Sequence, residues 1–371
     1  MKRSAQFFEI AGIVAAATVG DGVFALPYVF ANAGWLLSLF YLALVIVLVV
    51  SAHVIYLKTL EAEQEKERLL GLAEKRFGAT GFWIGFIAIV VGLLLTLVAY
   101  LVLGAQFIHL ILPSLPTHYG FVLFWLCISA LALASDKEVR FFELAGIACT
   151  SLIIIIIFIS AWPTIFFANA PVVRAAQFFL PFGAVLFSLA GWTSIEPAYE
   201  IRKRERGRFP WVAIATGTLF AASLYIMFTA GVLGSSPLGA VTPDTASGLA
   251  AWPLWKKDLL AALGLFAVAT VYLPIAREIK NSLERDLGWP RGTSRPLIVF
   301  FPAILIVLGL NNFLTIVGLV GGVFLSVQYL LIILVGRRSL RLGLVKTIWL
   351  DVVALVFAVA AVYSVYSFIV R

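Results

Sequence analysis

The chain has 371 residues, of which 62% are hydrophobic and only 12% are charged, and its mean hydropathy is +1.05. Soluble domains have about 45–50% apolar and about 25% charged residues, so one buried core cannot absorb the apolar excess. The composition excludes a soluble protein and predicts an integral membrane protein whose apolar surface faces lipid. The basic residues behind the net charge of +8 lie between the apolar runs, and we expect no nucleic-acid partner.

Apolar runs that can cross a hydrocarbon core, which takes about 20 residues, recur along the chain. We expect eleven membrane spans, at 7–31, 35–58, 81–112, 119–134, 139–168, 175–201, 209–234, 256–284, 296–311, 313–335 and 346–370. Backbone polar groups in lipid need partners within the segment, so the fold class is all-α. The polar stretch 59–80 carries leucines at roughly helical spacing among charges, which predicts a short surface helix.

The distribution of basic residues predicts the orientation of the spans. If the N-terminus is cytoplasmic, the cytoplasmic loops hold all of the 27 lysines and arginines except Arg174, Lys256, Lys257 and Arg371. Cytoplasmic loops are enriched in Lys and Arg, and a missed span would destroy this asymmetry. We therefore expect a multi-pass protein of the plasma (cytoplasmic) membrane with its N-terminus inside and its C-terminus outside.

The first span is interrupted midway by Gly20-Asp21-Gly22, which Thr18 precedes and Pro27 follows. Glycine permits unwound backbone and proline lacks a donor. The pattern could be a helix-packing groove with an ordinary proline kink. A carboxylate at membrane depth is costly and usually functional, so we favour a ligand or ion site.

The sixth span carries a second interruption, in which small and hydroxylated residues surround Gly191 and precede Glu196 and Pro197. Equivalent positions five spans apart belong to halves of opposite orientation, and paired broken helices in such halves indicate a transporter site. Unwound helices expose N–H groups that suit a carboxylate and C=O groups that suit an ammonium. The two interruptions therefore predict a site for a zwitterion.

Two stretches, one in the first span and one directly after it, carry a family resemblance. They are Gly20-Asp21-Gly22-Val23-Phe24-Ala25-Leu26-Pro27-Tyr28 and Asn32-Ala33-Gly34-Trp35. They resemble the first-helix signature of the amino acid–polyamine–organocation superfamily, most nearly its amino acid/auxin permease branch and the bacterial tryptophan/tyrosine permease family. Residues 186–200 are similar to the second broken helix of that family.

The resemblance implies the leucine-transporter fold, with ten core helices in a five-plus-five inverted repeat. The core would be residues 1–335, with repeat one at about 7–168 and repeat two at about 175–335, and 346–370 would be an added eleventh helix. Carried over by position, the contacts to the substrate backbone would fall on Thr18, Gly20, Asp21, Gly22, Ser188, Gly191 and Trp192.

Asp21 departs from the small residue that this family usually has between the two glycines. A fixed anion there would repel a substrate carboxylate, by an amount that depends on the local dielectric. Three alternatives remain open. Asp21 is protonated and couples transport to protons, or it binds a coupling cation or the substrate amine, or it points away from the site.

Other candidate residues lie near the two interruptions. Glu196 is either an ion-coupling proton carrier or the partner of a basic cytoplasmic loop at a gate. Thr270, in the eighth span, lies where sodium-coupled relatives place hydroxyl ligands, although polar packing is the simpler interpretation. Tyr100, in the third span, could face the substrate or the core. His53 and His109 lie near span ends, and we expect them at the membrane interface.

These features predict a secondary active transporter that imports amino acids, neutral or aromatic, by alternating access with H⁺ or Na⁺ as the coupling ion. The chain has no P-loop, no metal-ligand cluster and no catalytic constellation, so we expect no enzyme, no cofactor and no resident metal. An amino acid sensor or channel, or an intramembrane carboxylate enzyme, are the alternatives. The expected partners are the amino acid and the lipid bilayer, and the chain would be a monomer or a weak homo-oligomer.

Overall fold

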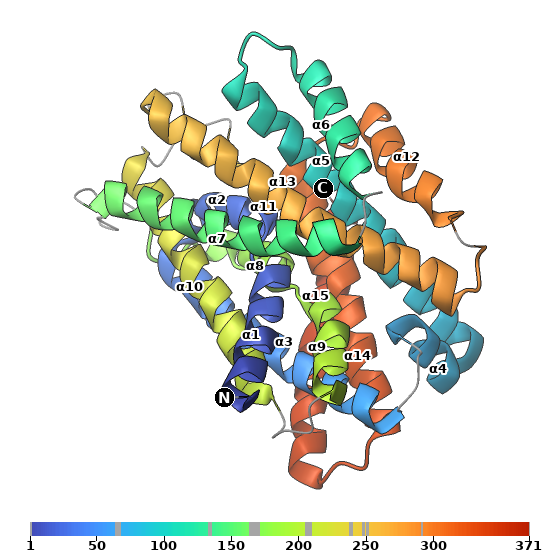
Figure 1. Ribbon diagram of the computed structural model, residues 1–371. Coiled ribbons are helices and arrows are strands. Elements are labelled where there is room, and N and C mark those ends of the chain that lie inside the picture. The colour runs from blue at the N-terminus through green and yellow to red at the C-terminus, as the bar shows by residue number, and fades with distance from the viewer. Residues whose placement is uncertain are drawn as a thin grey trace.

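The computed structural model describes residues 2–63, 68–132, 136–162, 171–204, 210–236, 240–246, 249, 252–290 and 292–370, with the side chains of 2–5, 136–145 and 204 left out of this description. All secondary-structure elements among these residues are helices. They form one bundle, in which long helices cross at varied angles around shorter ones (Figure 1).

The first half of the chain, up to the fifth span, forms seven α-helices and two short irregular helices. They are α1 (Lys2–Thr18), η1 (Asp21–Ala25), α2 (Leu26–Ala33), α3 (Trp35–Glu63), α4 (Leu69–Gly85), η2 (Phe86–Val91), α5 (Gly92–Ile111), α6 (Thr117–Ala132) and α7 (Asp136–Ala161).

The second half repeats the pattern of a short broken helix followed by long ones. Its elements are η5 (Ala175–Gln177), α8 (Leu180–Leu189), η6 (Trp192–Ser194), α9 (Ile195–Arg204), α10 (Trp211–Ser235), α11 (Leu254–Asn281), η8 (Ser282–Asp286), α12 (Ser294–Val307), α13 (Phe313–Leu319), η9 (Val320–Leu325), α14 (Ser326–Ser339) and α15 (Leu344–Val370).

Several helices are long and apolar enough to cross a membrane. Among the described residues six single helices meet this test, and the bent pair Gln6–Thr18 and Asp21–Ala33 adds a seventh when it is taken as one span. Three shorter apolar helices, Thr117–Ala132, Gly146–Ala161 and Ser294–Val307, accompany them. The chain is therefore a multi-pass membrane protein, and the total of eleven spans stays a prediction.

The polar stretch 59–80 contains a short helical segment between the second and third spans. Helix α3 continues through Glu63, and α4 starts at Leu69 and is interrupted at Gly78, whose φ of 62° and ψ of −150° separate its first turns from the helix that enters the third span. Leu69, Leu70 and Leu72 are at most 1% exposed because α4 packs against α14. The leucines at helical spacing therefore form the face of this short segment that packs on the rest of the protein.

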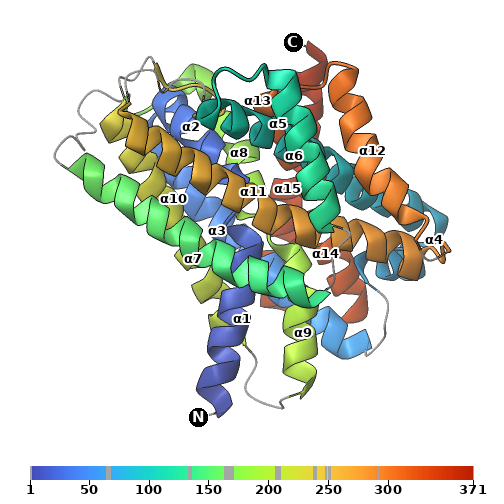
Figure 2. The ribbon, with the colours of Figure 1, turned by 45° about the horizontal axis from the view of Figure 1, so that its top comes forward.

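The two broken helices lie at the centre of the bundle. Helix α1 packs against α9 and α10, and α8 packs against α2 and α3. Figure 2 shows α1 and α9 projecting together at the side of the molecule where the chain begins, which we call the N-terminal side, while the C-terminus lies on the opposite side. The long helices α3, α5, α10 and α11 surround the breaks and bury them.

Candidate functional site

The first break separates α1 from η1. Helix α1 ends at Thr18, Gly20 is fully extended with φ −143° and ψ −161°, and η1 begins at Asp21. The two halves of this span are bent by 49°. Pro27 occupies the first turn of α2, where its missing N–H costs nothing because the first helical N–H groups have no partner within the helix. The backbone therefore leaves the helical conformation at a defined point inside this span, and helical structure resumes directly after it.

The second break has the same construction in α8 and α9. Helix α8 ends at Leu189, Ala190 is extended with ψ 116°, and Gly191 has φ −145°. A 3-10 turn, η6, begins at Trp192 and leads directly into α9. As at the first break, two residues leave the helical conformation and a short 3-10 helix follows. Both helices are thus broken where the sequence predicts it.

The two breaks lie against each other. A Cβ atom on Gly22 would lie 2.6 Å from the Cα atom of Ser188, and one on Gly191 would lie 2.6 Å from Oγ1 of Thr18. Only glycine allows the two backbones to approach so closely. The structure therefore brings together Thr18, Gly22, Ser188 and Gly191, four of the residues predicted to contact substrate.

Tyr225 of α10 joins the two breaks through one hydroxyl group. Its Oη lies within hydrogen-bond distance of the Thr18 carbonyl and 2.7 Å from the Ser188 carbonyl. A hydroxyl has a single hydrogen to donate, so the two carbonyls share it. Tyr225 is fully buried. Sequence reasoning missed this residue, since a tyrosine within an apolar run gives no signal of a partner so far away in sequence.

The second break also contacts Tyr329 of α14 and His53 of α3. The Gly191 N–H donates to the Tyr329 hydroxyl at 3.3 Å, and the same hydroxyl lies 3.1 Å from His53 Nε2. His53 is 0% exposed, so its expected place at the membrane interface is wrong. Its position near the end of a span misled the prediction because α3 extends beyond that end. His109, in contrast, is exposed.

Trp192, the first residue after the second break, is held by Gln328 of α14. The Trp192 indole N–H donates to Gln328 Oε1 at 2.6 Å, and Gln328 Nε2 donates to the Ala88 carbonyl at 2.7 Å. Ala88 lies in η2, a π-helical segment. The amide of Gln328 therefore links the second break to the third span and fixes the orientation of the indole.

Asp21 is almost completely buried, with 1% of its surface exposed. The backbone N–H groups of Asp21 itself and of Gly22 lie near its carboxylate. Within the described part of the chain, Oδ2 has no hydrogen-bond partner. An ionised carboxylate inside a protein is costly unless a cation or further donors offset its desolvation, so this oxygen provides a place for a cationic group.

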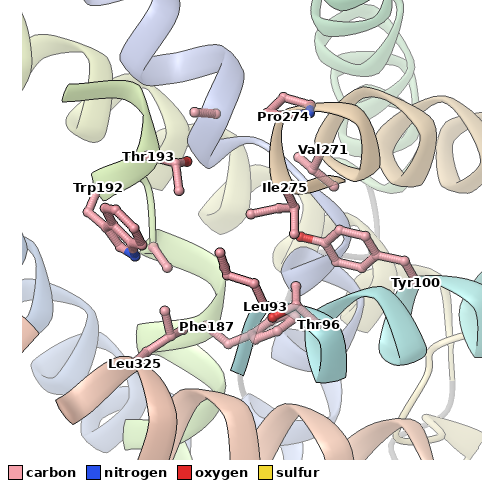
Figure 3. Close-up of a pocket in the computed structure, with 12 residues that line it drawn as sticks. Leu93, Thr96, Tyr100, Phe187, Trp192, Thr193, Val271, Pro274, Ile275 and Leu325 are labelled. Carbon is pink, nitrogen blue, oxygen red and sulfur yellow. The ribbon is translucent and has the colours of Figure 1, made fainter. Parts of the chain in front are cut away.

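A small cavity of about 30 Å³ lies beside the breaks. Figure 3 shows Trp192 on one side of it and Tyr100 of α5 on the other. Val271, Pro274 and Ile275 of α11 lie on the side of Tyr100, and Phe187 of α8 also lines the cavity. Tyr100 and Trp192 are therefore the predicted substrate residues that line this cavity. The glycines of both breaks and Asp21 are not among its lining residues.

An ion-pair cluster closes the N-terminal side below the second break. Arg68 Nε lies 2.9 Å from Glu196 Oε2, and Arg68 Nη1 lies 2.6 Å from Glu278 Oε2. The Tyr56 hydroxyl donates to Glu196 Oε1 at 2.7 Å. One arginine thus ties α9 to α11. Glu196 has the basic-loop partner that was one of its two predicted roles, and Arg68, Glu278 and Tyr56 were not predicted.

The loops on the opposite side cover the end of the first broken helix. The Thr245 hydroxyl donates to the Phe24 carbonyl at 2.6 Å, and the Arg174 N–H donates to the Ala33 carbonyl at 2.9 Å. Gly34 ends α2 with φ 101°, a conformation that favours glycine. In this conformation the breaks are buried from both sides of the molecule.

Thr270 of α11, a predicted ion ligand, is not placed among the residues of the two breaks. Its hydroxyl donates to the Ala267 carbonyl at 2.9 Å, and its methyl group faces Gly146 of α7. The neighbouring residue, Val271, is the one that contacts Gly20, where an added Cβ would lie 2.6 Å from Val271 Cγ1. The hydroxyl of Thr270 is therefore satisfied within its own helix, and a role as an ion ligand stays a prediction.

Comparison with solved structures shows which fold this arrangement belongs to. The chain is similar to MhsT in complex with L-phenylalanine, with a TM-score of 0.71 and 14% sequence identity over 97% of this chain and 98% of that one. It is also similar to a mutant of the manganese transporter of Eremococcus coleocola, with a TM-score of 0.58 and 14% identity over 96% and 93% of the two chains. The predicted leucine-transporter fold is confirmed.

Comparison with sequences gives the family. None of the curated proteins compared with the chain matches it. The tryptophan/tyrosine permease family matches residues 3–256, which include both breaks, Tyr225 and the Arg68 cluster except Glu278. The resemblance seen in the first span therefore extends over most of the chain. With the two broken helices in place and the fold of known transporters, the chain belongs to the tryptophan/tyrosine permease family and is a membrane transporter of a small molecule, not an enzyme.

Proposed function

We propose that this transporter imports amino acids, preferring neutral and aromatic side chains, by alternating access coupled to a cation gradient. The observation that supports this proposal is the close contact between two broken helices beside an aromatic cavity. One break offers a buried carboxylate, and the other offers backbone N–H groups at the start of a helix. A zwitterion needs a carboxylate to bind its ammonium group and N–H donors to bind its carboxylate.

Asp21 decides how the zwitterion is oriented. The N–H groups at the start of η1, those of Asp21 and Gly22, lie near the Asp21 carboxylate, whose negative charge would repel a substrate carboxylate there. The unpartnered Oδ2 of Asp21 suits an ammonium group, since charge-assisted hydrogen bonds are the strong ones. We therefore assign the substrate amine to Asp21.

The substrate carboxylate then falls to the second break. Gly191 and Trp192 begin the continuous helical segment formed by η6 and α9, and the Gly191 N–H bonds only a tyrosine hydroxyl at the long distance of 3.3 Å. Helix starts favour anions because their N–H groups lack intrahelical partners. Thr18 Oγ1 also lies beside Gly191, but it donates its hydrogen to the Val14 carbonyl at 2.7 Å, so the N–H groups of the second break are the donors for the carboxylate.

The substrate side chain is assigned to the cavity of Figure 3. In this closed conformation its volume is about 30 Å³, below the range of about 300–1,000 Å³ usual for small-molecule sites, so the cavity has to widen when a substrate binds. Tyr100, Phe187 and Trp192 present aromatic surface, which packs well against an aromatic side chain through edge-to-face contacts. A charged side chain would find no partner there, since the other lining residues are apolar apart from Thr96 and Thr193.

Transport requires that the two closures open in turn. Rocking of one helix bundle would release the Arg68 cluster on the N-terminal side, which we assign to the cytoplasm, or the Thr245 contact on the opposite side. A substrate and a cation that both stabilise the closed state couple their movements. H⁺ and Na⁺ are the candidate cations.

Counterflow in proteoliposomes tests this function. Vesicles that contain the purified protein and unlabelled L-tryptophan or L-phenylalanine should accumulate the labelled amino acid transiently, whereas protein-free vesicles should not. A thermal-shift screen of the common amino acids identifies further ligands, because a ligand that binds the folded state raises the melting temperature. Binding without counterflow would indicate a sensor, flux without saturation would indicate a channel, and either result would refute the proposal.

A further inference from the structure

His53 is a titratable residue at the centre of the transporter to which the proposed mechanism gives no task. It is 0% exposed, and it lies on α3, which packs against α8, α9, α10 and α14. Its ring faces the second break, because a Cβ on Gly191 would lie 3.7 Å from His53 Cε1. The imidazole therefore borders the place where a substrate carboxylate would bind.

The hydrogen bonds around Tyr329 determine the state of the ring. The Tyr329 oxygen accepts the Gly191 N–H, so its own hydrogen is free to donate to His53 Nε2 at 3.1 Å. In the tautomer that uses this hydrogen, His53 Nε2 is the acceptor and Nδ1 carries the ring hydrogen of the neutral imidazole. Nδ1 is buried and has no partner among the described residues. One polar atom of this ring is therefore unsatisfied in the substrate-free state.

The titratable groups on the surrounding helices do not stabilise a charge on this ring. Tyr329 of α14, Tyr56 of α3 and Tyr225 of α10 are neutral phenols at physiological pH. Glu196 of α9 already bonds Tyr56 and Arg68, and α8 contributes no titratable side chain. A second proton on His53 would thus create a buried charge without a counter-ion, which is strongly unfavourable.

A substrate carboxylate at the second break changes this balance. It would place an anion next to the ring, and the attraction between the two charges would offset the desolvation of both. Once His53 carries two protons, its Nε2–H donates to the Tyr329 oxygen, and the Tyr329 hydrogen is released to bond the carboxylate. The protonated His53 ring is thus the counter-ion of the substrate carboxylate, and the carboxylate is the counter-ion of the ring.

We infer that His53 is the proton-binding residue of this transporter, and that its proton and the substrate carboxylate bind together. The inference rests on the proposed function, since it requires a substrate with a carboxylate at Gly191. One proton from the solution is added to His53 as the substrate binds, and it leaves when the substrate leaves on the other side. Because linkage is reciprocal, a proton gradient then drives substrate accumulation.

Calorimetry of the purified protein tests the linkage directly. L-tryptophan is titrated into wild type and His53→Gln in buffers of different ionisation enthalpy, with L-phenylalanine as the second probe. Wild type should take up about one proton per substrate, and its Kd should rise about tenfold per pH unit above neutrality. His53→Gln should take up none and keep a pH-independent Kd. The exposed His109→Gln is the matched control and should behave as wild type.

Proteoliposomes give the corresponding transport result. His53→Gln should lose accumulation driven by a pH gradient, and any counterflow that remains should not depend on pH, whereas His109→Gln should retain both activities as in wild type. Accumulation by His53→Gln at the wild-type level would overturn the inference and leave the proposed function intact. Failure of wild type to bind either amino acid or to show counterflow would refute the proposed function instead.

A third measurement covers the case in which His53→Gln does not fold. The chain has only three histidines, so the double variant His109→Gln/His118→Gln leaves His53 as the only imidazole. Nitrogen NMR of labelled histidine should show a neutral ring without substrate and a doubly protonated ring with saturating L-tryptophan at pH 7. A ring that stays neutral in the presence of bound substrate would overturn the inference.

Discussion

Asp21 replaces a small residue in the first break and changes the polarity of the site. Its carboxylate lies near the two N–H groups at the start of η1, and only 1% of the residue's surface is exposed. One of the three alternatives for this residue is that it points away from any ligand. In that case both carboxylate oxygens would need hydrogen-bond partners within the protein. The unpartnered Oδ2 favours a cationic partner, so we propose the amine.

Replacing Asp21 by asparagine tests this assignment. Asparagine keeps the size and can still accept the two N–H groups, but it removes the charge. Loss of a charge-assisted hydrogen bond of about 1.5–3 kcal/mol should raise the Kd for L-tryptophan tenfold or more in a binding titration. The exposed Asp351→Asn should leave the Kd unchanged. A normal Kd together with loss of ion-driven uptake would instead make Asp21 the ion-coupling residue.

Tyr225 holds the two breaks together, and its hydroxyl can be removed without changing the shape of the side chain. In Tyr225→Phe the buried Thr18 and Ser188 carbonyls lose their common donor, at a cost of about 1–3 kcal/mol. We expect a lower melting temperature in detergent. Tyr366→Phe, on an exposed residue, should not change it. An unchanged melting temperature in Tyr225→Phe would show that water or another donor replaces the hydroxyl.

The sequence predicted the residues of the breaks but not those that hold them. Glycines, a carboxylate and prolines inside an apolar run are exceptional in lipid, so Gly20, Asp21 and Gly191 attract attention without any structure. Tyr329 and Gln328 are ordinary residues of an apolar helix, and their partners lie more than 130 positions away. Such contacts depend on how the helices pack, which a hydropathy pattern does not contain.

At the scale of the elements, the apolar runs predicted the helices well because lipid requires helical backbone. The span expected at 35–58 is α3, Trp35–Glu63, and the one expected at 346–370 is α15, Leu344–Val370. Helices extend beyond the apolar run wherever polar residues continue the helical backbone outside the lipid. Before the third span, the leucines at helical spacing predicted the first turns of α4, which pack against α14. The repeat boundaries at about 7–168 and 175–335 stay a prediction.

The close contact between the broken helices predicts a position-specific effect of added methyl groups. In Gly22→Ala the new Cβ would lie 2.6 Å from the Ser188 Cα, and backbone cannot move aside as a flexible side chain can. The two breaks must separate, so we expect counterflow to fall at least tenfold.

Gly12→Ala is the matched control on the same broken helix. No heavy atom outside its own helix lies within 4 Å of the added Cβ, and alanine favours helix over glycine by about 1 kcal/mol. Counterflow should therefore be unchanged and the melting temperature equal or higher. Equal activity of Gly22→Ala and Gly12→Ala would show that the breaks do not need to touch.

At the scale of the whole molecule, the structure is closed on both sides by contacts of different strength. The Arg68 cluster joins α9 to α11 through two charged contacts with little exposure, whereas the opposite side is held by neutral hydrogen bonds such as that of Thr245 to Phe24. Charged hydrogen bonds are worth about 1.5–3 kcal/mol and neutral ones about 0.5–1.5 kcal/mol. We therefore propose that the N-terminal side is the harder one to open.

Removing Arg68 should open that side. In Arg68→Gln two buried carboxylates, those of Glu196 and Glu278, lose the cation that they share, and breaking a buried pair costs about 3–5 kcal/mol. The closed arrangement loses this stabilisation, while an open one, in which water reaches both acids, does not. The population should shift towards the state open to the N-terminal side.

The shift can be measured by thiol accessibility at Thr193, which lines the cavity. In a Thr193→Cys variant without Cys127 and Cys149, Arg68→Gln should raise the rate of labelling by a membrane-impermeant reagent applied from the N-terminal side at least tenfold. Arg337→Gln is the control, because its pair with Asp351 is 36% and 47% exposed and such pairs contribute about 0–1 kcal/mol. Equal labelling rates in the two variants would mean that the cluster does not close this path, and the closure would have to lie in the packing of α1 against α9.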